Sequence, residues 1–250
     1  MAEGKTLQVI VFAVLFGIAI SAAGKPGERI AAVFADLNEV IMKLVALLMN
    51  LAPYGVFFLM AKLFTGLGLS AILNLAEYFL VLAGTLVIHG LVTYSVMLKG
   101  FTGLSPITFL KKMEDAIMFA FSTASSNATI PVTMETAKNR MGVDNRISSF
   151  TVPLGATVNM DGTAIMQGVA TAFIAQAFNI DLTMGDYLMV IMTATLASIG
   201  TAGVPGVGLV MLAMVLNQVG LPLEGIALIM GVDRLLDMIR TAVNLSLIHI

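Results

Sequence analysis

The sequence contains no cysteine, no tryptophan and only two histidines among its 250 residues. Without cysteine the chain has no disulfide, no thiolate metal site and no cysteine nucleophile. One histidine is next to last, and His89 lies in an apolar run, where we expect it to be a hydrogen-bond partner in helix packing. Charged residues are also scarce, at 11% against about 25% in a typical soluble domain. With a net charge of −2, the sequence shows no basic patch for nucleic acid.

Apolar residues dominate instead, at 58% of the chain. A transmembrane helix needs about 20 apolar residues in succession. Runs of about this length or longer lie at residues 7–23, 40–63, 78–98, 149–178 and 221–247. The composition therefore predicts a polytopic helical membrane protein.

Two further apolar segments are interrupted by residues that break helices. Residues 107–141 contain STASSNATIP at 122–131, and residues 188–219 contain SIGTAGVPGVG at 198–208. Glycine, proline and clustered small hydroxyl residues favour turns over helix. Each segment therefore resembles two short helices joined by an unwound tip.

Loop charge predicts from which side each broken segment enters the membrane. Lys111 and Lys112 precede the first one, and Lys138 and Arg140 follow its tip, whereas the stretch before the second, residues 181–186, has two aspartates and no basic residue. Basic loops stay in the cytoplasm. The first hairpin should therefore enter from the cytoplasm and the second from outside. Irregular backbone at membrane depth must be covered by protein, so the two tips should meet near the midplane.

The order of these segments repeats along the chain. A hairpin at about 105–141 is followed by a broken polar helix at about 147–178, and a hairpin at about 186–219 is followed by a last helix at 221–250. The two units have opposite orientation, which is the pattern of an inverted repeat. The predicted fold class is an all-α membrane protein, a polytopic helical bundle with two oppositely oriented re-entrant hairpins.

The stretch NMDGT at residues 159–163 lies within a predicted span. Asp161-Gly162 predicts a helix break, and a break frees backbone carbonyls. Carboxylate, amide and carbonyl oxygens are the ligands that hard cations prefer. The stretch therefore indicates a small-cation site. The alternative is a buried aspartate that its own helix satisfies.

The last helix carries most of its polar groups on one stripe. At 100° per residue, Asp233, Asp237, Arg240, Thr241 and Asn244 fall within an arc of about 100°. Charge is costly in hydrocarbon, so this stripe must face protein or a cavity. Arg240 can hold a carboxylate in a bidentate fork and Asp237 an ammonium group. The alternative is an Asp–Arg pair that only neutralises itself.

The hairpin tips supply further polar groups. Ser125, Ser126, Asn127 and Thr129 could bind a carboxylate, with help from a half-helix that begins at Pro131. Close packing of small residues is the alternative for this tip. The tip at 198–208 has four glycines and Pro205, and we expect a mobile flap rather than an ordinary loop.

Four motifs closely resemble the dicarboxylate/amino acid:cation symporter family, the glutamate and aspartate transporters. They are SSNATIPVT at 125–133, PLGATVNMDGTAIMQG at 153–168, SIGTAGVPGVG at 198–208 and LLDMIRTAVN at 235–244. The resemblance covers essentially the whole chain to Asn244. It implies an elevator-type symporter, not an enzyme, that forms a homotrimer and crosses the inner cell membrane several times. It also implies sodium as the co-transported ion, an acidic amino acid as substrate and no organic cofactor.

The same resemblance assigns the domains and the site residues. Residues 1–67 would be helices of the scaffold and trimerisation side, and residues 68–250 the transport domain. Substrate contacts fall to Ser125, Ser126, Thr163, Val204, Gly208, Asp237, Arg240, Thr241 and Asn244. Sodium ligands are Gly155, Asn159, Asp161 and Asn244, with backbone from Thr157, Ser198, Ile199 and Thr201.

Several alternatives remain open at this point. Neutral amino acid symporters of the family lack the arginine at 240 and C4-dicarboxylate symporters lack the aspartate at 237, so both residues together favour aspartate or glutamate. Gln167 stands where proton-coupled glutamate symporters have glutamate, and an amide cannot exchange a proton at physiological pH. An intramembrane hydrolase that uses Ser125 or Ser126 lacks a GxSxG elbow and a suitable base. A channel is a further alternative, since re-entrant loops also occur in channels.

The resemblance also predicts that the chain is a truncated fragment. Family members begin with about three more spans and continue past Asn244 along the last helix. Here residues 245–250 diverge, and Ile248 stands where the family has a sodium-binding aspartate. We therefore expect the transport-domain architecture with an incomplete sodium site near Asn244, in a chain that does not itself transport.

Overall fold

The computed structural model describes the backbone of residues 6–67 and 69–248, and its side chains except at 1–10, at scattered positions between 38 and 72, and at 247–250. The chain divides into two compact units, Met1–Thr65 and Gly66–Ile250. Every regular element in the described residues is a helix. The predicted all-α fold is therefore confirmed, while the predicted domain boundary lies at residue 68, outside the described residues.

The first unit consists of two helices, α1 (Thr6–Ala22) and most of α2 (Lys25–Leu67). They are joined at Gly24, whose φ of +62° is a left-handed conformation that suits glycine. The predicted run 7–23 corresponds to α1. The run 40–63 lies inside α2, whose 43 residues extend for about 65 Å. This is roughly twice the hydrocarbon thickness of a bilayer.

The second unit begins with a long rod made of α3 (Leu69–Ile88), the π-helical turn η1 (His89–Thr93) and α4 (Tyr94–Thr102). Among the residues with described side chains, Leu73–Thr102 is the one helical stretch long and apolar enough to cross a membrane. It contains the predicted run 78–98. The predicted runs at 149–178 and 221–247 do not qualify, because the first is divided into two helices and the second carries charges.

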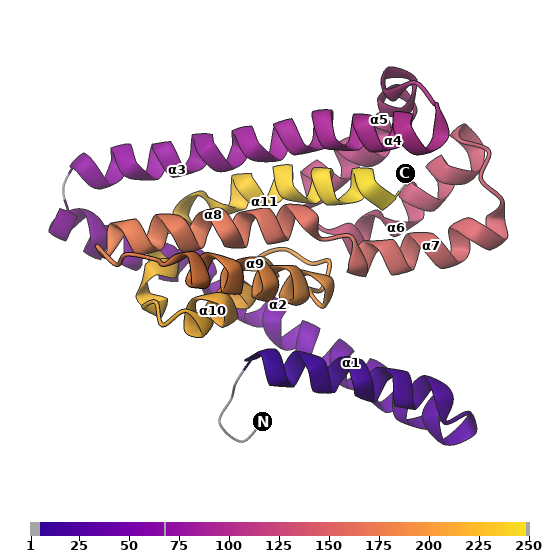
Figure 1. Ribbon diagram of the computed structural model, residues 1–250, viewed down its shortest axis with the longest axis horizontal. Coiled ribbons are helices and arrows are strands. Elements are labelled where there is room, and N and C mark those ends of the chain that lie inside the picture. The colour runs from indigo at the N-terminus through magenta and orange to yellow at the C-terminus, as the bar shows by residue number, and fades with distance from the viewer. Residues whose placement is uncertain (1–5, 68, 249–250) are drawn as a thin grey trace. The chain divides into compact units, whose positions relative to one another are not determined.

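Both predicted hairpins are present (Figure 1). The first comprises α5 (Pro106–Thr123), α6 (Ser126–Glu135) and the π-turn η2 (Thr136–Arg140). The second comprises α9 (Met184–Ile199), which starts with a capping box formed by Thr183 and Asp186, and α10 (Val207–Gln218). The tip between α9 and α10 is non-helical over residues 200–206.

The first tip is shorter than the sequence predicts. We expected the returning half-helix to begin at Pro131, but α6 begins at Ser126 and Pro131 lies inside it. The reason is an N-cap: the side chain of Ser125 accepts a hydrogen bond from the Ala128 N–H at 3.2 Å. Pro131 has no backbone N–H, so α6 has one intrahelical hydrogen bond fewer than a helix without proline, and the helix continues past it to Glu135.

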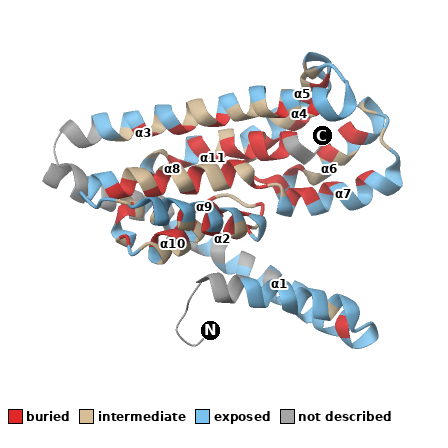
Figure 2. Cartoon of the chain, viewed as in Figure 1, coloured by how far each residue is buried: buried red, intermediate tan, exposed pale blue. Residues whose placement is uncertain are grey.

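The broken helix and the last helix complete the unit. The broken helix is α7 (Asn145–Val158) followed by α8 (Asp161–Ala177), so its break lies at residues 159–160 rather than at the predicted Asp161-Gly162. After the short η3 (Leu223–Gly225), α11 (Ile226–Ile248) runs between α3 and α8 (Figure 1). Figure 2 shows that buried residues concentrate on α8 and α11. The side chain of Ile248, where the sequence predicts a lost sodium ligand, lies outside the described residues.

Candidate functional site

The two hairpin tips meet at the carbonyl oxygen of Gly203. It accepts hydrogen bonds from the Ser125 hydroxyl at 2.8 Å and from the Asn127 N–H at 3.0 Å. The approach needs glycine, because a Cβ at residue 203 would lie 2.8 Å from the Asn127 Oδ1 and 2.9 Å from the Ser126 Cβ. The tips predicted to converge from opposite sides of the membrane are therefore in direct contact.

Three charged side chains of α11 lie together beside this contact. Arg240 Nη2 is 2.5 Å from Asp237 Oδ1, and Arg240 Nη1 is 3.5 Å from Asp233 Oδ1. All three residues are at most 5% exposed. Such burial requires pairing, because an isolated charge is costly away from water. Two carboxylates and one guanidinium leave this cluster with one net negative charge.

Asp237 also joins α11 to the second hairpin. Its Oδ2 accepts a hydrogen bond from the Gly206 N–H at 2.9 Å. Gly206 has a φ of +80°, a left-handed conformation that glycine adopts without strain. The carboxylate predicted to bind an ammonium group thus faces a guanidinium on one side and a hairpin tip on the other.

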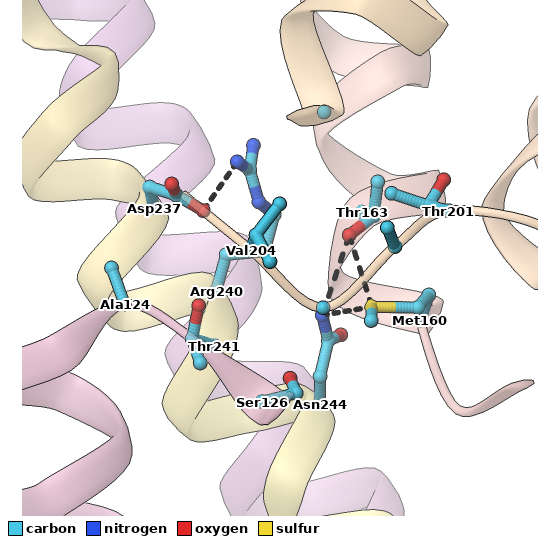
Figure 3. Close-up of a pocket in the computed structure, with 13 residues that line it drawn as sticks. Ala124, Ser126, Met160, Thr163, Thr201, Val204, Asp237, Arg240, Thr241 and Asn244 are labelled. Atoms are coloured by element: carbon cyan, nitrogen blue, oxygen red, sulfur yellow. Dashed lines mark hydrogen bonds and ion pairs between the residues drawn. The ribbon is translucent and has the colours of Figure 1, made fainter. Parts of the chain in front are cut away.

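A small cavity lies where α8, α11 and the two tips converge (Figure 3). It has room for about one water molecule. Eight of the nine predicted substrate residues line it: Ser126, Thr163, Val204, Gly208, Asp237, Arg240, Thr241 and Asn244. The ninth, Ser125, is occupied by the contact with Gly203. Ala124, Met160, Ala202 and Gly203 also line the cavity, together with the predicted sodium ligand Thr201.

Asn244 connects the last helix to the break in the polar helix. Its Oδ1 accepts a hydrogen bond from the Gly162 N–H at 2.7 Å. Its Nδ2 lies 3.3 Å from the Thr163 hydroxyl and 3.2 Å from the Met160 sulfur. Figure 3 marks both contacts with dashed lines. A Cβ at Gly162 would lie 2.8 Å from the Asn244 Oδ1 and 3.2 Å from the Arg240 backbone, so glycine permits this close approach.

Asp161 is held from a different direction. Its Oδ2 accepts hydrogen bonds from the Tyr94 hydroxyl and from His89 Nε2, the latter at 2.7 Å. Its Oδ1 is buried and has no hydrogen-bond partner. We expected Asp161 within reach of Asn159, Asn244 and the backbone of 198–201. Among the described side chains, its hydrogen bonds go to the α3–α4 rod instead.

The other predicted sodium ligands lie at two helix ends. Gly155 and Asn159 belong to the end of α7, where the Asn159 N–H donates to the Gly155 carbonyl at 2.9 Å, and the side chain of Thr157 is exposed. Ser198 and Ile199 end α9, and the Thr201 N–H donates to the Ser198 carbonyl at 3.0 Å. Helix C-termini leave carbonyls without intrahelical partners. Both breaks can therefore offer oxygen ligands to a cation.

Several residues of this region were not among the predicted site residues. The sequence placed Asp233 on the polar stripe but gave it no role, and the structure pairs it with Arg240. His89 and Tyr94 both contact Asp161. A polar side chain in an apolar run needs a partner, and this was the available signal for His89. Which partner it finds depends on the backbone of η1, which residue types do not show.

Two buried groups bear on the proton-coupled symporter and on the intramembrane hydrolase, two of the alternatives that the sequence left open. Gln167 on α8 is fully buried, and neither amide atom of its side chain has a hydrogen-bond partner. The Ser125 hydroxyl donates to a carbonyl and caps α6, which is not the arrangement of an activated nucleophile. The site therefore resembles a ligand-binding cavity rather than a hydrolytic centre.

Comparison with known proteins agrees with this geometry. The family model described as "Sodium:dicarboxylate symporter family" matches residues 1–247. An "Excitatory amino acid transporter" of Caenorhabditis elegans is 41% identical over 240 residues, which are 95% of this chain and 48% of that protein. "Excitatory amino acid transporter 1" of Mus musculus is 40% identical over 95% of this chain and 44% of its own length.

A bacterial relative is similar over an even larger part of the chain. The "Proton/sodium-glutamate symport protein" of Bacillus subtilis (strain 168) is 37% identical over 246 residues, which are 98% of this chain and 57% of that protein. The chain thus spans about half the length of the curated relatives it matches. With nearly every residue matched by the family model, the chain belongs to the sodium:dicarboxylate symporter family.

Proposed function

We propose that this chain provides the substrate site of a sodium-coupled symporter for acidic amino acids. The observation that carries the proposal is the buried Asp237–Arg240 pair in the cavity between the hairpin tips. An anion and a cation on the same wall of a small cavity suit a ligand that has both charges. The names of the relatives, which include glutamate symport, agree with such a ligand.

Each end of an acidic amino acid finds a partner in this cavity. Its side-chain carboxylate would take Arg240 in a bidentate contact, and its ammonium group would take Asp237. Thr241, Asn244 and Ser126 line the same cavity and can hold its α-carboxylate. The ligand would thus replace one internal ion pair by two external ones, while its α-carboxylate would have only neutral hydrogen-bonding partners in the cavity.

Charge balance supports cation coupling. Asp233, Asp237 and Arg240 sum to one negative charge, and Asp161 nearby adds another. An acidic amino acid brings a further net negative charge into a region that is largely buried. Cations that enter with the substrate would offset this accumulation, which is costly at low dielectric. Asp161, Asn159, Asn244 and the carbonyls at the ends of α7 and α9 would be their ligands.

Gln167 favours sodium over protons as the driving ion. It is fully buried on α8 and cannot carry a proton at physiological pH. Proton-coupled glutamate symport is the second candidate, because one relative is named a proton/sodium-glutamate symporter. A C4-dicarboxylate or a neutral amino acid would leave Asp237 or Arg240, respectively, without an external partner.

The remaining features of the proposal follow from family membership. We infer a homotrimer in the inner cell membrane, an elevator-type movement of residues 68–250 against residues 1–67, and the second hairpin as the flap over the substrate. The tip 200–206 is non-helical and is held to the first hairpin and to Asp237 by hydrogen bonds, which supports its role as a flap. The expectation that the chain alone does not transport stays a prediction, so the function is tested by binding.

Calorimetry of the purified chain in lipid nanodiscs tests the proposal. Aspartate, malate and serine would each be titrated in sodium and in potassium buffer. The proposal predicts that aspartate binds in sodium with a Kd at least about tenfold lower than in potassium, a difference of roughly 1.4 kcal/mol. Such binding would contradict the separate prediction that the incomplete sodium site near Asn244 makes the chain non-functional. Tighter binding of malate or serine than of aspartate would contradict the assignment, as would aspartate binding that ignores sodium.

A further inference from the structure

The π-turn η1 places two hydrogen-bond donors on one face of the α3–α4 rod. Its defining hydrogen bond runs from the Tyr94 N–H to the His89 carbonyl. In a regular α-helix, residues five apart point about 140° away from each other. An i to i+5 hydrogen bond instead brings them onto the same side of the helix. The His89 and Tyr94 rings accordingly touch edge to face, with their centroids 4.9 Å apart.

Both donors converge on a single oxygen atom of Asp161. His89 Nε2 lies 2.7 Å from Oδ2, and the Tyr94 hydroxyl donates to the same atom. In the neutral tautomer with its proton on Nε2, His89 is a donor like Tyr94. The other oxygen, Oδ1, is buried without a partner. The carboxylate is thus fixed at one oxygen and free at the other.

A carboxylate held in this way is oriented for a cation. Groups that hydrogen-bond to a metal ligand fix its direction, and their loss typically weakens metal affinity by about 10–100-fold. Asp161 lies at the start of α8, beside the helix break that frees the α7 carbonyls. Oδ1 is therefore the atom of Asp161 that remains for a cation at this break.

We propose that His89 and Tyr94 form a positioning clamp, which holds Oδ2 of Asp161 so that Oδ1 serves as the sodium ligand. The inference rests on the proposed function in one respect, that sodium binds at Asp161. It assigns positioning roles to His89 and Tyr94, neither of which is among the site residues predicted from the sequence. The π-turn is the structural cause, since without it the two side chains would face different directions.

The test measures sodium binding to the full chain in nanodiscs for four variants. Tyr94→Phe and His89→Leu each remove one donor, whereas His89→Gln keeps an N–H near the same place. Thr85→Val is the matched control, because the Thr85 hydroxyl on the same rod bonds only to the Val81 carbonyl of its own helix at 2.7 Å. We expect Tyr94→Phe and His89→Leu to raise the sodium Kd at least about tenfold. His89→Gln should stay within about threefold of the wild type, and Thr85→Val should match it.

Infrared difference spectra separate positioning from a general structural role. Sodium should shift a carboxylate stretching band that is absent in Asp161→Asn. In Tyr94→Phe at saturating sodium this band should move, because Oδ2 has lost one donor. A variant that only loosened helix packing would lower the melting temperature and leave the band in place. If Tyr94→Phe does not fold, the comparison of His89→Leu with His89→Gln carries the test.

Three results would overturn the clamp. They are wild-type sodium affinity in both donor-deleting variants, an unmoved carboxylate band, or no sodium-induced carboxylate band in the wild-type chain. Aspartate binding is recorded separately. If aspartate binding depends on sodium but Tyr94→Phe and His89→Leu bind sodium as the wild type does, only the clamp is rejected. If these two variants lose sodium affinity but aspartate does not bind to the wild-type chain, only the proposed substrate is rejected.

Discussion

Asp237 and Arg240 pair at 2.5 Å across one turn of α11, inside a cavity with room for about one water molecule. The cavity is therefore too small for an amino acid in this structure, and its charges largely neutralise one another. A substrate must open the hairpin contact and replace the internal pair. A ligand with a single charge would leave one partner of the pair buried and uncompensated.

Replacement of the guanidinium tests the substrate assignment. Arg240→Cys should weaken aspartate binding by roughly 30-fold or more, since loss of one partner of a buried charge pair costs about 2–5 kcal/mol. Binding of a neutral amino acid such as serine should persist or improve. Arg234→Cys is the control, because Arg234 is exposed on the same helix. Unchanged aspartate affinity in Arg240→Cys would remove Arg240 from the site.

The contact between the hairpin tips requires a residue without a side chain at position 203. Gly203→Ala would place a Cβ 2.8 Å from the Asn127 Oδ1 and 3.1 Å from the Ala156 carbonyl oxygen, so the tips could not close as they do here. We expect aspartate affinity to fall about tenfold, or roughly 1.4 kcal/mol. Gly200→Ala in the same tip meets its nearest atom at 3.9 Å and should bind within twofold of the wild type. Equal affinities of the two variants would argue against the tip contact as part of the site.

Alanine substitutions at two glycines of α8 should have opposite effects on stability. Gly162→Ala would press a Cβ against Asn244 at 2.8 Å and against the Arg240 backbone at 3.2 Å, so the helices must separate. We expect a lower melting temperature and weaker ligand binding. Gly168→Ala meets nothing within 4 Å and should leave the melting temperature unchanged or higher, because alanine favours helix by about 1 kcal/mol. A Gly162→Ala variant as stable as Gly168→Ala would contradict the close packing of α8 on α11.

Gln167 makes a prediction about the coupled ion. Aspartate binding to the wild-type chain should depend on sodium and vary little between pH 6 and pH 8. Gln167→Glu introduces a titratable group at a fully buried position and should make binding stronger at the acidic end of this range. Gln176→Glu, at an exposed position of the same helix, should not. Acid-dependent binding already present in the wild type would favour the proton-coupled alternative.

Much of the architecture could be predicted from residue types in order. Apolar runs, basic loops and the interruptions at 122–131 and 198–208 were enough to predict two hairpins, because hydrocarbon admits few ways to satisfy a polar backbone. The polar stripe of α11 was also predictable, since helical periodicity determines which residues share a face. Local capping was harder to foresee. With Ser125 as its N-cap, α6 begins at Ser126, five residues before the predicted Pro131, and the break at 159–160 precedes Asp161 rather than including it.

The sequence by itself determined which groups must be protected from lipid, among them Asp233, Asp237, Arg240 and Asp161. It did not determine their partners. Only the tertiary structure brought Gly203 to Ser125, Gly162 to Asn244, and His89 with Tyr94 to Asp161. The reason is physical: a polar group in an apolar segment requires some partner, and any correctly placed donor lowers the cost. Which donor lies within hydrogen-bond distance depends on the helix breaks, on the π-turn and on the close approach of other residues to Gly162 and Gly203. These features follow from the packing of the whole unit.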